Sequence, residues 1–335
     1  MEKNTIVCVT GGAGFIGSSL VKKLLERGYT VHATLRSLGD DNLKVRLLRG
    51  LPHASTRLRL FEADVYDPDT FGEAIQGCQF VFHVAHPMVH NSQSSKHKNV
   101  SEAAVAAVKS IVGHCKRSGT VKRLIYTASV VAASPLNHDG SCFTHSPDES
   151  CWTNLHLPYA YTIDKFTEYT HSKTLAEKEV LSHCGNLEVV SLACGLVGGD
   201  SILPTVPESS VVIISQGLGN SLGYQALRFL EELLGKVPLI HVEDVINAHI
   251  FCLESSGKIS GRYLCASDFS SSPDIASCIR QCCPDVRIAE GFIEDTKRGI
   301  SWGSSKLKEE GFEYKHNLSS IMEDSLKSAK RIGIW

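Results

Sequence analysis

The sequence predicts a doubly wound α/β fold, in which a parallel sheet carries helices on both faces, with a smaller domain interleaved into it. Two observations lead to this prediction. Strand-like and helix-like segments alternate through the first half of the chain, which is typical of βαβ units and a parallel sheet. After about Gly195 the alternation weakens. We therefore expect a first domain over residues 1–195, to which 238–268 return, and a second domain over 196–237 and 269–335.

Residue type and spacing predict the individual elements. Thr5–Thr10 is a β-branched run that ends in glycines, as a buried strand would. From Phe15 to Glu26 apolar side chains recur at helical spacing, and Gly28 follows. The other predicted strands are Thr30–Leu35, Leu58–Phe61, Phe80–Val84, Leu124–Ala128, Val189–Ala193 and Leu239–His241. The other predicted helices are Pro68–Gln76, Asn99–Ser118, Glu168–Leu181, Val211–Gln216, Gln225–Leu234 and a segment that ends at Glu254.

Composition excludes several classes of protein. The chain has 34 Lys and Arg against 36 Asp and Glu, a net charge of −2, which argues against nucleic acid or an anionic membrane as the main partner. Hydrophobic residues make up 42% and charged residues 21%, values of a folded rather than a disordered chain. Neither a membrane-spanning run nor a signal peptide is seen. We expect a cytoplasmic protein that acts on a small molecule, as a monomer or possible dimer.

The twelve cysteines do not follow a metal-binding pattern. No CxxC pair and no zinc-finger spacing of cysteine and histidine occurs. Several cysteines lie inside apolar runs, where a free thiol packs as a small hydrophobic group. The sequence therefore predicts packing thiols and no metal site, and only the role of Cys151 stays open.

A glycine-rich turn follows the first predicted strand and leads into the first helix. Gly11, Gly14 and Gly17 fit the pattern GxxGxxG, which lets the backbone turn sharply and approach a pyrophosphate. Phe15 and Ile16 lie at the helix N-terminus, where free N–H groups and the helix dipole favour an anion. The turn predicts a dinucleotide cofactor bound to a Rossmann-type sheet.

Charge at the end of the second strand distinguishes the two nicotinamide cofactors. An acidic residue there would hold the 2′-hydroxyl of NAD, but this chain has Arg36, with Lys44 farther on. A guanidinium suits a 2′-phosphate, so we expect NADP(H). The ends of the next two strands are predicted to contact the cofactor through Asp64 and Val65, and through Val84 and Ala85.

Two YxxxK patterns are candidates for the proton donor that carbonyl reduction needs. They are Tyr161 with Lys165 and Tyr169 with Lys173, and on a helix either pair would share one face. We favour Tyr169, because it leads into a strong helix-forming run. Lys173 would favour the phenolate and so lower a pKa that is ordinarily about 10. Both Tyr169 and Lys173 are also predicted to contact the cofactor, and Lys173 could hold the nicotinamide ribose.

A hydroxyl group is wanted on the other side of the reacting oxygen. Ser129 ends the predicted strand Leu124–Ala128 and is favoured, while Ser134 is the competing hydroxyl. The hypothesis for the catalytic residues is therefore Ser129, Tyr169 and Lys173.

These motifs together resemble the extended short-chain dehydrogenase/reductases. More narrowly, the chain looks like the plant group of dihydroflavonol reductase, anthocyanidin reductase and vestitone reductase. The resemblance rests on segments along nearly the whole chain: VTGGAGFIGSSLVKKLLERGYTV, ADVYDPDTF, GCQFVFHVAHPM, VKRLIYTAS, SKTLAEK, HVEDVINAHI and GRYLCAS. It implies an NADPH-dependent reductase of bulky, phenolic plant metabolites, with Ser129, Tyr169 and Lys173 as the catalytic triad.

Several positions depart from the pattern of the group. Ser134 stands where dihydroflavonol reductases have Asn or Asp, Gly195 replaces a proline, and His86 replaces a Thr or Ser. The segment around Cys151 is also similar to cinnamoyl-CoA reductases, but Pro158 takes the place of their second cysteine. The substrate pocket is predicted to include His86, Ser134, Tyr161 and Leu203.

The departures keep alternatives open. One is a reductase of a non-flavonoid carbonyl, such as an alkaloid or terpenoid ketone or an aromatic aldehyde. The other, from a different class, is a regulatory protein that binds NADP without catalysis.

Overall fold

The chain folds into two compact units, which we describe one at a time. The computed structural model describes residues 5–39, 42–87, 97–185, 187–257, 259–295 and 300–335. Unit 1 consists of Met1–Ala128, Leu175–Leu192 and Ile246–Arg262. Unit 2 consists of Ser129–Thr174, Ala193–Val245 and Tyr263–Trp335.

The larger sheet has seven strands in the order β3-β2-β1-β4-β5-β6-β9, and most of its residues lie in unit 1, although β5, β6 and β9 end in unit 2. Its strands are β1 (Ile6–Thr10), β2 (Thr30–Leu35), β3 (Leu58–Glu62), β4 (Phe80–His83), β5 (Arg123–Ser129), β6 (Glu188–Cys194) and β9 (Gly261–Cys265). The pairings of β1 with β2 and β4, of β2 with β3 and of β4 with β5 are parallel. The strand order reverses at β1, so the ends of β1 and β4 flank the point where such sheets bind ligands. The predicted doubly wound sheet is confirmed.

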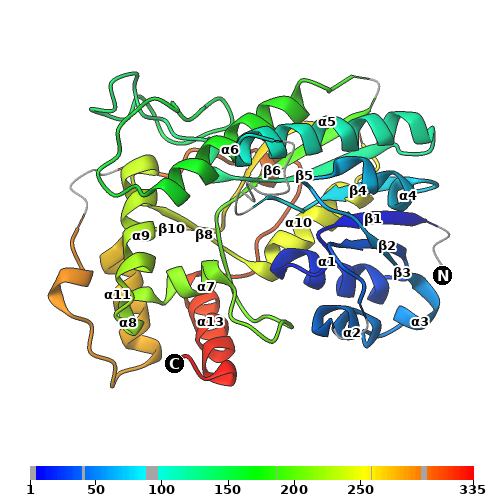
Figure 1. Cartoon of the computed structure of the whole chain (residues 1–335). Helices are drawn as coiled ribbons and strands as arrows, with labels where there is room; N and C mark the ends of the chain where they lie inside the picture. The colour runs from blue at the N-terminus through cyan, green and yellow to red at the C-terminus, as the bar shows by residue number, and fades with distance from the viewer. Residues whose placement is uncertain (1–4, 40–41, 88–96, 186, 258, 296–299) are drawn as a thin grey trace. The chain divides into compact units, whose positions relative to one another are not determined.

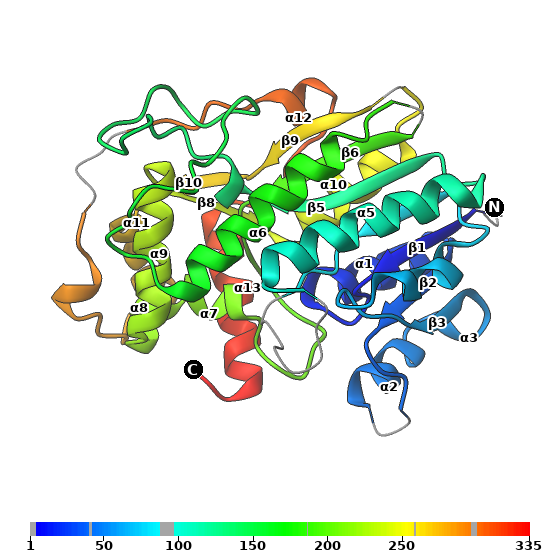
Figure 2. The same ribbon diagram turned by 45° about the horizontal axis from the view of Figure 1, so that its top comes forward.

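Helices connect the strands and flank the sheet (Figures 1 and 2). They are α1 (Phe15–Glu26), α2 (Leu43–Arg49), α3 (Ala54–Arg57), the 3-10 turn η1 (Pro68–Phe71), α4 (Gly72–Ile75), α5 (Val100–Ser118), α6 (Asp164–Leu181) and α10 (Val242–Glu254). In both views α5 runs alongside β5. The chain of α6 passes from unit 2 into unit 1 after Thr174, and that of α10 does so after Val245.

Unit 2 has its own small sheet and its own apolar core. Its strands are β7 (Leu196–Gly198), β8 (Val237–His241) and β10 (Asp268–Ser270), in the order β10-β8-β7. Its helices are η2 (Val130–Ala132), α7 (Glu208–Ile213), α8 (Ser215–Leu218), α9 (Ser221–Leu234), α11 (Ser272–Cys282), η3 (Glu290–Phe292), α12 (Lys306–Glu309) and α13 (Leu318–Ile332). Buried side chains from α7, α9, α11 and α13 meet in the core, among them Ile213, Leu227, Leu233, Ile279 and Ile321.

The compact units divide the chain differently from the predicted domains. Residues 129–174 group with unit 2, although the predicted first domain ran without a break to residue 195. The reason is packing: Val130 and Val131 are part of the unit 2 core, and Tyr169 packs against it. Residues 238–245 likewise belong to unit 2, because β8 pairs with β7 and β10.

In the described part of the chain, none of the helices has both the length and the apolar character that crossing a membrane demands.

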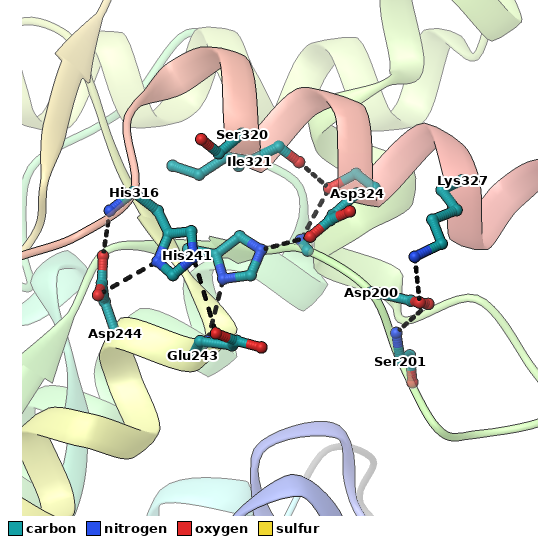
Figure 3. Close-up of polar contacts among 12 residues, drawn as sticks. Asp200, Ser201, His241, Glu243, Asp244, His316, Ser320, Ile321, Asp324 and Lys327 are labelled. Atoms are coloured by element: carbon teal, nitrogen blue, oxygen red, sulfur yellow. Dashed lines mark hydrogen bonds and ion pairs between the residues drawn. The ribbon is translucent and has the colours of Figure 1, made fainter.

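A cluster of histidines and carboxylates holds the start of α13 against β8 in unit 2 (Figure 3). His241, the last residue of β8, is buried, and its ring stacks on His316 with centroids 4.1 Å apart. Its Nδ1 accepts a hydrogen bond from the backbone N–H of Glu243 (3.1 Å), and its Nε2 lies 3.3 Å from an oxygen of Asp324. The other ring, His316, lies 3.3 Å from Asp244. Burial and the neighbouring His316 lower the pKa of His241, against the opposing effect of the carboxylates.

The lowered pKa of His241 predicts a loss of stability in mild acid. The unfolded chain takes up a proton at the ordinary pKa of about 6.5, whereas the folded chain resists protonation until a lower pH. The free energy of unfolding should therefore fall as the pH drops below about 6.5, by at most about 1.4 kcal/mol per pH unit for this one group. Urea unfolding of His241→Gln at several pH values should show a shallower loss than the wild type.

Two other histidines set the background of that experiment. Burial also lowers the pKa of His32 and of His114, and both remain in the variant, so part of the acid loss should persist. If the two proteins lose stability in parallel between pH 7.5 and 5, His241 does not contribute to the pH dependence.

Candidate functional site

The turn between β1 and α1 is shaped by close backbone contacts. Gly11 has a positive φ of 67°, and a Cβ there would lie 2.9 Å from the Cα of Ala85. At Gly17 a Cβ would lie 2.2 Å from the carbonyl oxygen of Gly11. Gly14 differs, because its φ of −81° and ψ of 177° are open to any residue and the contact would be 3.4 Å. Gly11 and Gly17 are thus required by the turn itself, and Gly14 is not.

Gly14 caps α1 without a side-chain hydrogen bond. The first N–H groups of a helix have no partner inside the helix, so those of Phe15 and Ile16 suit an anion at this end. The turn itself does not require glycine at position 14. A glycine there is instead explained by a ligand that comes close to the backbone.

Thr10 was not predicted from the sequence, although it connects the end of β1 to the residues that follow β4. Its buried hydroxyl accepts hydrogen bonds from the backbone N–H groups of Val84 and Ala85, both at 3.1 Å. The same hydroxyl lies 2.9 Å from Nδ1 of His83. Because it already accepts two bonds, we assign its proton to His83. Val84 and Ala85, which follow β4 and precede the half-buried His86, are thereby fixed to the end of β1.

Alanine at positions 14 and 17 should separate folding from cofactor binding. Gly17→Ala should lower the free energy of unfolding of the unliganded protein by about 1–3 kcal/mol, because the new methyl group overpacks the turn. Gly14→Ala should leave that stability nearly unchanged but weaken NADPH binding on the order of tenfold. Urea unfolding without ligand and a fluorescence titration with NADPH test both. Equal stability losses in the two variants would contradict this division of roles.

The proposed phosphate-binding pair is available to solvent. Arg36 follows β2 directly and is exposed, as is Lys44 in the first turn of α2. That turn is capped by Asn42, whose side chain accepts a hydrogen bond from the Lys44 backbone N–H at 3.0 Å. Farther along the sheet edge, the Asp64 carboxylate accepts the N–H of Tyr66 (3.0 Å), which shapes the local turn, and Val65 is buried.

In unit 2, Ser129 and Tyr169 are brought together. Ser129 ends β5, and its Oγ accepts the N–H of Val131 at 3.4 Å. A hydrogen bond also joins its side chain to the Tyr169 phenol. Lys173 lies one turn farther along α6 and is only 5% exposed. Burial raises the pKa of Tyr169, and the bond from Ser129 opposes it without reversing it. The net direction is opposite to that expected from Lys173 alone, because burial dominates.

The competing YxxxK pattern does not lie on one helix. Tyr161 precedes α6, and its backbone N–H donates to Glu232 at 3.0 Å. Lys165 forms an ion pair with Glu208. The guanidinium of Arg228 lies over the Tyr161 ring, 5.1 Å from its centroid. These contacts describe a packed aromatic side chain and a surface ion pair.

The competing hydroxyl is also engaged elsewhere. Ser134 is buried, and its Oγ donates to the carbonyl oxygen of Leu233 at 2.5 Å. Leu203, another predicted pocket residue, is buried as well. The structure therefore brings together Ser129 and Tyr169 but does not bring Ser134 to them.

A buried ion pair anchors the second half of α6 within unit 1. Glu177, which is fully buried, accepts bonds from Nε and Nη2 of Arg262 at 3.0 and 2.9 Å. The Ser191 hydroxyl donates to the same carboxylate at 2.6 Å. Glu177 lies one turn after Lys173, so its ion pair fixes the helix that carries Tyr169 and Lys173. Its partners are far away in sequence, so no local pattern pointed to it.

The fold and these residues define a class of protein. The chain belongs to the NAD dependent epimerase/dehydratase family, which it matches over residues 7–266. The predicted resemblance to the plant reductase group, and the oxidoreductase class with it, are confirmed by the individual relatives.

Among those relatives is a dihydroflavonol 4-reductase of Gerbera hybrida, 36% identical over 98% of this chain and 87% of the relative. An anthocyanidin reductase of Vitis vinifera that forms a (2S)-flavan-3-ol is 34% identical over 98% of this chain and 96% of the relative. The crystal structure of vestitone reductase from alfalfa has a TM-score of 0.78 and 32% identity, covering 98% of this chain and 99% of that one.

Proposed function

We propose that this protein is an NADPH-dependent reductase of a bulky, aromatic plant carbonyl compound, with Tyr169 as the proton donor. The observation that carries the proposal is the hydrogen bond between Ser129 and Tyr169 beside the buried Lys173. The related proteins are named as reductases, among them dihydroflavonol 4-reductase and vestitone reductase, which supports the substrate class.

The residues of unit 1 fit the cofactor. The open position at Gly14 and the uncapped N-terminus of α1 suit a pyrophosphate, and the exposed Arg36 and Lys44 suit a 2′-phosphate. A crystal structure of a yeast reductase with the same fold, 20% identical, is described as a complex with NADPH. When bound, NADPH supplies the hydride.

Residues of unit 2 would supply the proton that the substrate oxygen takes up during reduction. Because burial keeps the pKa of Tyr169 above its usual value, the phenol is protonated at neutral pH and can donate to the oxygen that gains charge during reduction. Ser129 orients the phenol through their hydrogen bond and can donate to the same substrate oxygen. The buried ammonium of Lys173 favours the tyrosinate left behind.

One contact favours a substrate other than a dihydroflavonol. Ser134 holds the position of the Asn or Asp that dihydroflavonol reductases carry, and its hydroxyl donates to Leu233. It is therefore not available to substrate hydroxyl groups. We infer a carbonyl that needs no polar contact here, such as an alkaloid or terpenoid ketone or an aromatic aldehyde, as the second candidate.

None of the twelve cysteines, all of which the structure describes, forms a disulfide bond. Free thiols in this number are typical of a reducing compartment, which supports a cytoplasmic enzyme.

The test is consumption of NADPH, with NADH in parallel, across a panel of flavonoid, alkaloid, terpenoid and phenolic carbonyls, with each product identified. We expect an alcohol product, or a reduced flavonoid, from at least one compound and a preference for NADPH. Tight NADPH binding without turnover of any compound would instead favour a regulatory protein. Failure to bind either cofactor would contradict both.

A further inference from the structure

Three different side chains converge in the loop that leads from η2 to α6. His145, Asp148 and Cys151 are spaced three residues apart, and each contributes one atom to the cluster. Sγ of Cys151 lies 3.3 Å from Nε2 of His145 and 3.6 Å from Oδ1 of Asp148. The third side of the triangle, from Nε2 to Oδ1, is 3.8 Å. A thiol sulfur, an imidazole nitrogen and a carboxylate oxygen thus lie within 3.8 Å of one another.

The neighbouring hydrogen bonds determine which nitrogen of His145 faces the other two side chains. Thr144 Oγ1 donates its proton to the carbonyl oxygen of Pro135 at 3.0 Å. The same oxygen lies 2.8 Å from Nδ1 of His145 and must therefore accept from it. Nδ1 carries the ring proton, so the lone pair of Nε2 is directed to Cys151.

The carboxylate is oriented as well. Oδ1 of Asp148 accepts the backbone N–H of Ser150 at 2.8 Å and its hydroxyl at 2.6 Å. Supporting bonds of this kind, to an imidazole and to a carboxylate, are typical around metal ligands.

The distances fit one metal ion. Zinc binds thiolate sulfur at about 2.3 Å and imidazole nitrogen or carboxylate oxygen at about 2.0–2.2 Å, with tetrahedral geometry. Ligand atoms at those lengths are about 3.3–3.6 Å apart, close to the three distances of this cluster. A catalytic Cys-His-Asp triad would instead place the carboxylate on the other ring nitrogen. Here that nitrogen is occupied by Thr144.

We propose that His145, Asp148 and Cys151 form a zinc site with a fourth position for water or another ligand. The mixture of sulfur, nitrogen and oxygen favours zinc over magnesium or calcium, which bind oxygen ligands. His145 also lines a cavity of about 570 Å³ in unit 2. The proposal departs from the sequence prediction of no metal site, and it is independent of the proposed reductase activity.

A second group of potential ligands in unit 2 is less suited to a metal. His241, Glu243 and His316 also lie close together, but the two rings are stacked at 19°. Lone pairs in the planes of nearly parallel rings do not meet at one ion.

The test is a Co²⁺ titration of the full-length protein after treatment with a chelator. Tetrahedral Co²⁺ bound to a thiolate absorbs strongly in the visible range and shows a sulfur-to-metal charge-transfer band. We expect both signals to saturate at one equivalent and to disappear when Zn²⁺ is added. They should be lost in Cys151→Ala and His145→Ala. Cys142→Ala, which removes an exposed thiol of the same loop, should keep them.

A supporting residue provides a graded readout. Thr144→Val removes the acceptor for Nδ1 and should weaken Zn²⁺ binding about 10–100-fold, measured by competition with a chromogenic chelator. The His145 side chain is 46% exposed, so His145→Ala should fold even if Cys151→Ala does not, and circular dichroism checks this. A wild-type protein without a saturable charge-transfer band would overturn the proposal. So would a band that survives in a folded His145→Ala or Cys151→Ala variant.

Discussion

Replacing Tyr169 with phenylalanine is expected to lower kcat for carbonyl reduction by about 10²–10⁴-fold, the usual contribution of a positioned general acid. The variant loses the phenolic proton while keeping the ring. Its hydrogen bond with Ser129 is lost too, but both residues remain packed in unit 2. The measurement is steady-state NADPH oxidation with the best compound of the panel. NADPH affinity, followed by fluorescence, should change little.

The other YxxxK tyrosine is a matched control. Tyr161→Phe keeps the ring beneath Arg228 and leaves the backbone bond to Glu232 in place. Its kcat should stay within a few-fold of the wild type. A Tyr169→Phe variant with full turnover would remove Tyr169 from the mechanism, and a large loss in Tyr161→Phe alone would transfer the role to that residue.

Glu177→Ala is expected to lower the free energy of unfolding by about 3–5 kcal/mol, because it leaves the Arg262 guanidinium buried without its carboxylate. Arg262 is only 5% exposed, and Glu177 is fully buried. The hydroxyl of Ser191 loses its acceptor as well. Urea unfolding in the absence of cofactor measures the change. If enough protein folds, its specific activity should also fall, since Glu177 fixes α6.

Glu179 lies on the same helix and is the control for charge. It contacts Lys109 at 3.6 Å and His183 at 3.0 Å, both at least partly exposed to solvent. Glu179→Ala should therefore lower stability by at most about 1 kcal/mol. Equal losses in the two variants would mean that burial of the ion pair is not what makes Glu177 important.

Local signals predicted the first βαβ unit well. The predicted bounds Phe15–Glu26 and Thr30–Leu35 are those of α1 and β2, because glycine turns and apolar periodicity act over a few residues. The region beyond Glu254 was left largely unassigned, although α11 begins with a capping box between Ser271 and Asp274. That signal was present in the sequence, so α11 could have been predicted.

Other features depend on distant contacts. The role of Thr10 rests on backbone groups of Val84 and Ala85, and that of Glu177 rests on Arg262. Neither partner is close in sequence. Convergence of His145, Asp148 and Cys151 is local, but their spacing matches no common metal motif, and only the folded loop brings their atoms together.

The contrast between buried and exposed groups around β1 and β2 has a practical consequence for engineering. A Cβ added at Gly11 or Gly17 would lie 2.9 or 2.2 Å from a neighbouring backbone atom, and the Thr10 hydroxyl accepts two backbone hydrogen bonds at 3.1 Å. Arg36 and Lys44, which follow β2, are exposed. Cofactor preference can therefore be redesigned at the two cationic positions without disturbing the scaffold, whereas changes at Gly11, Gly17 or Thr10 would alter binding and stability together.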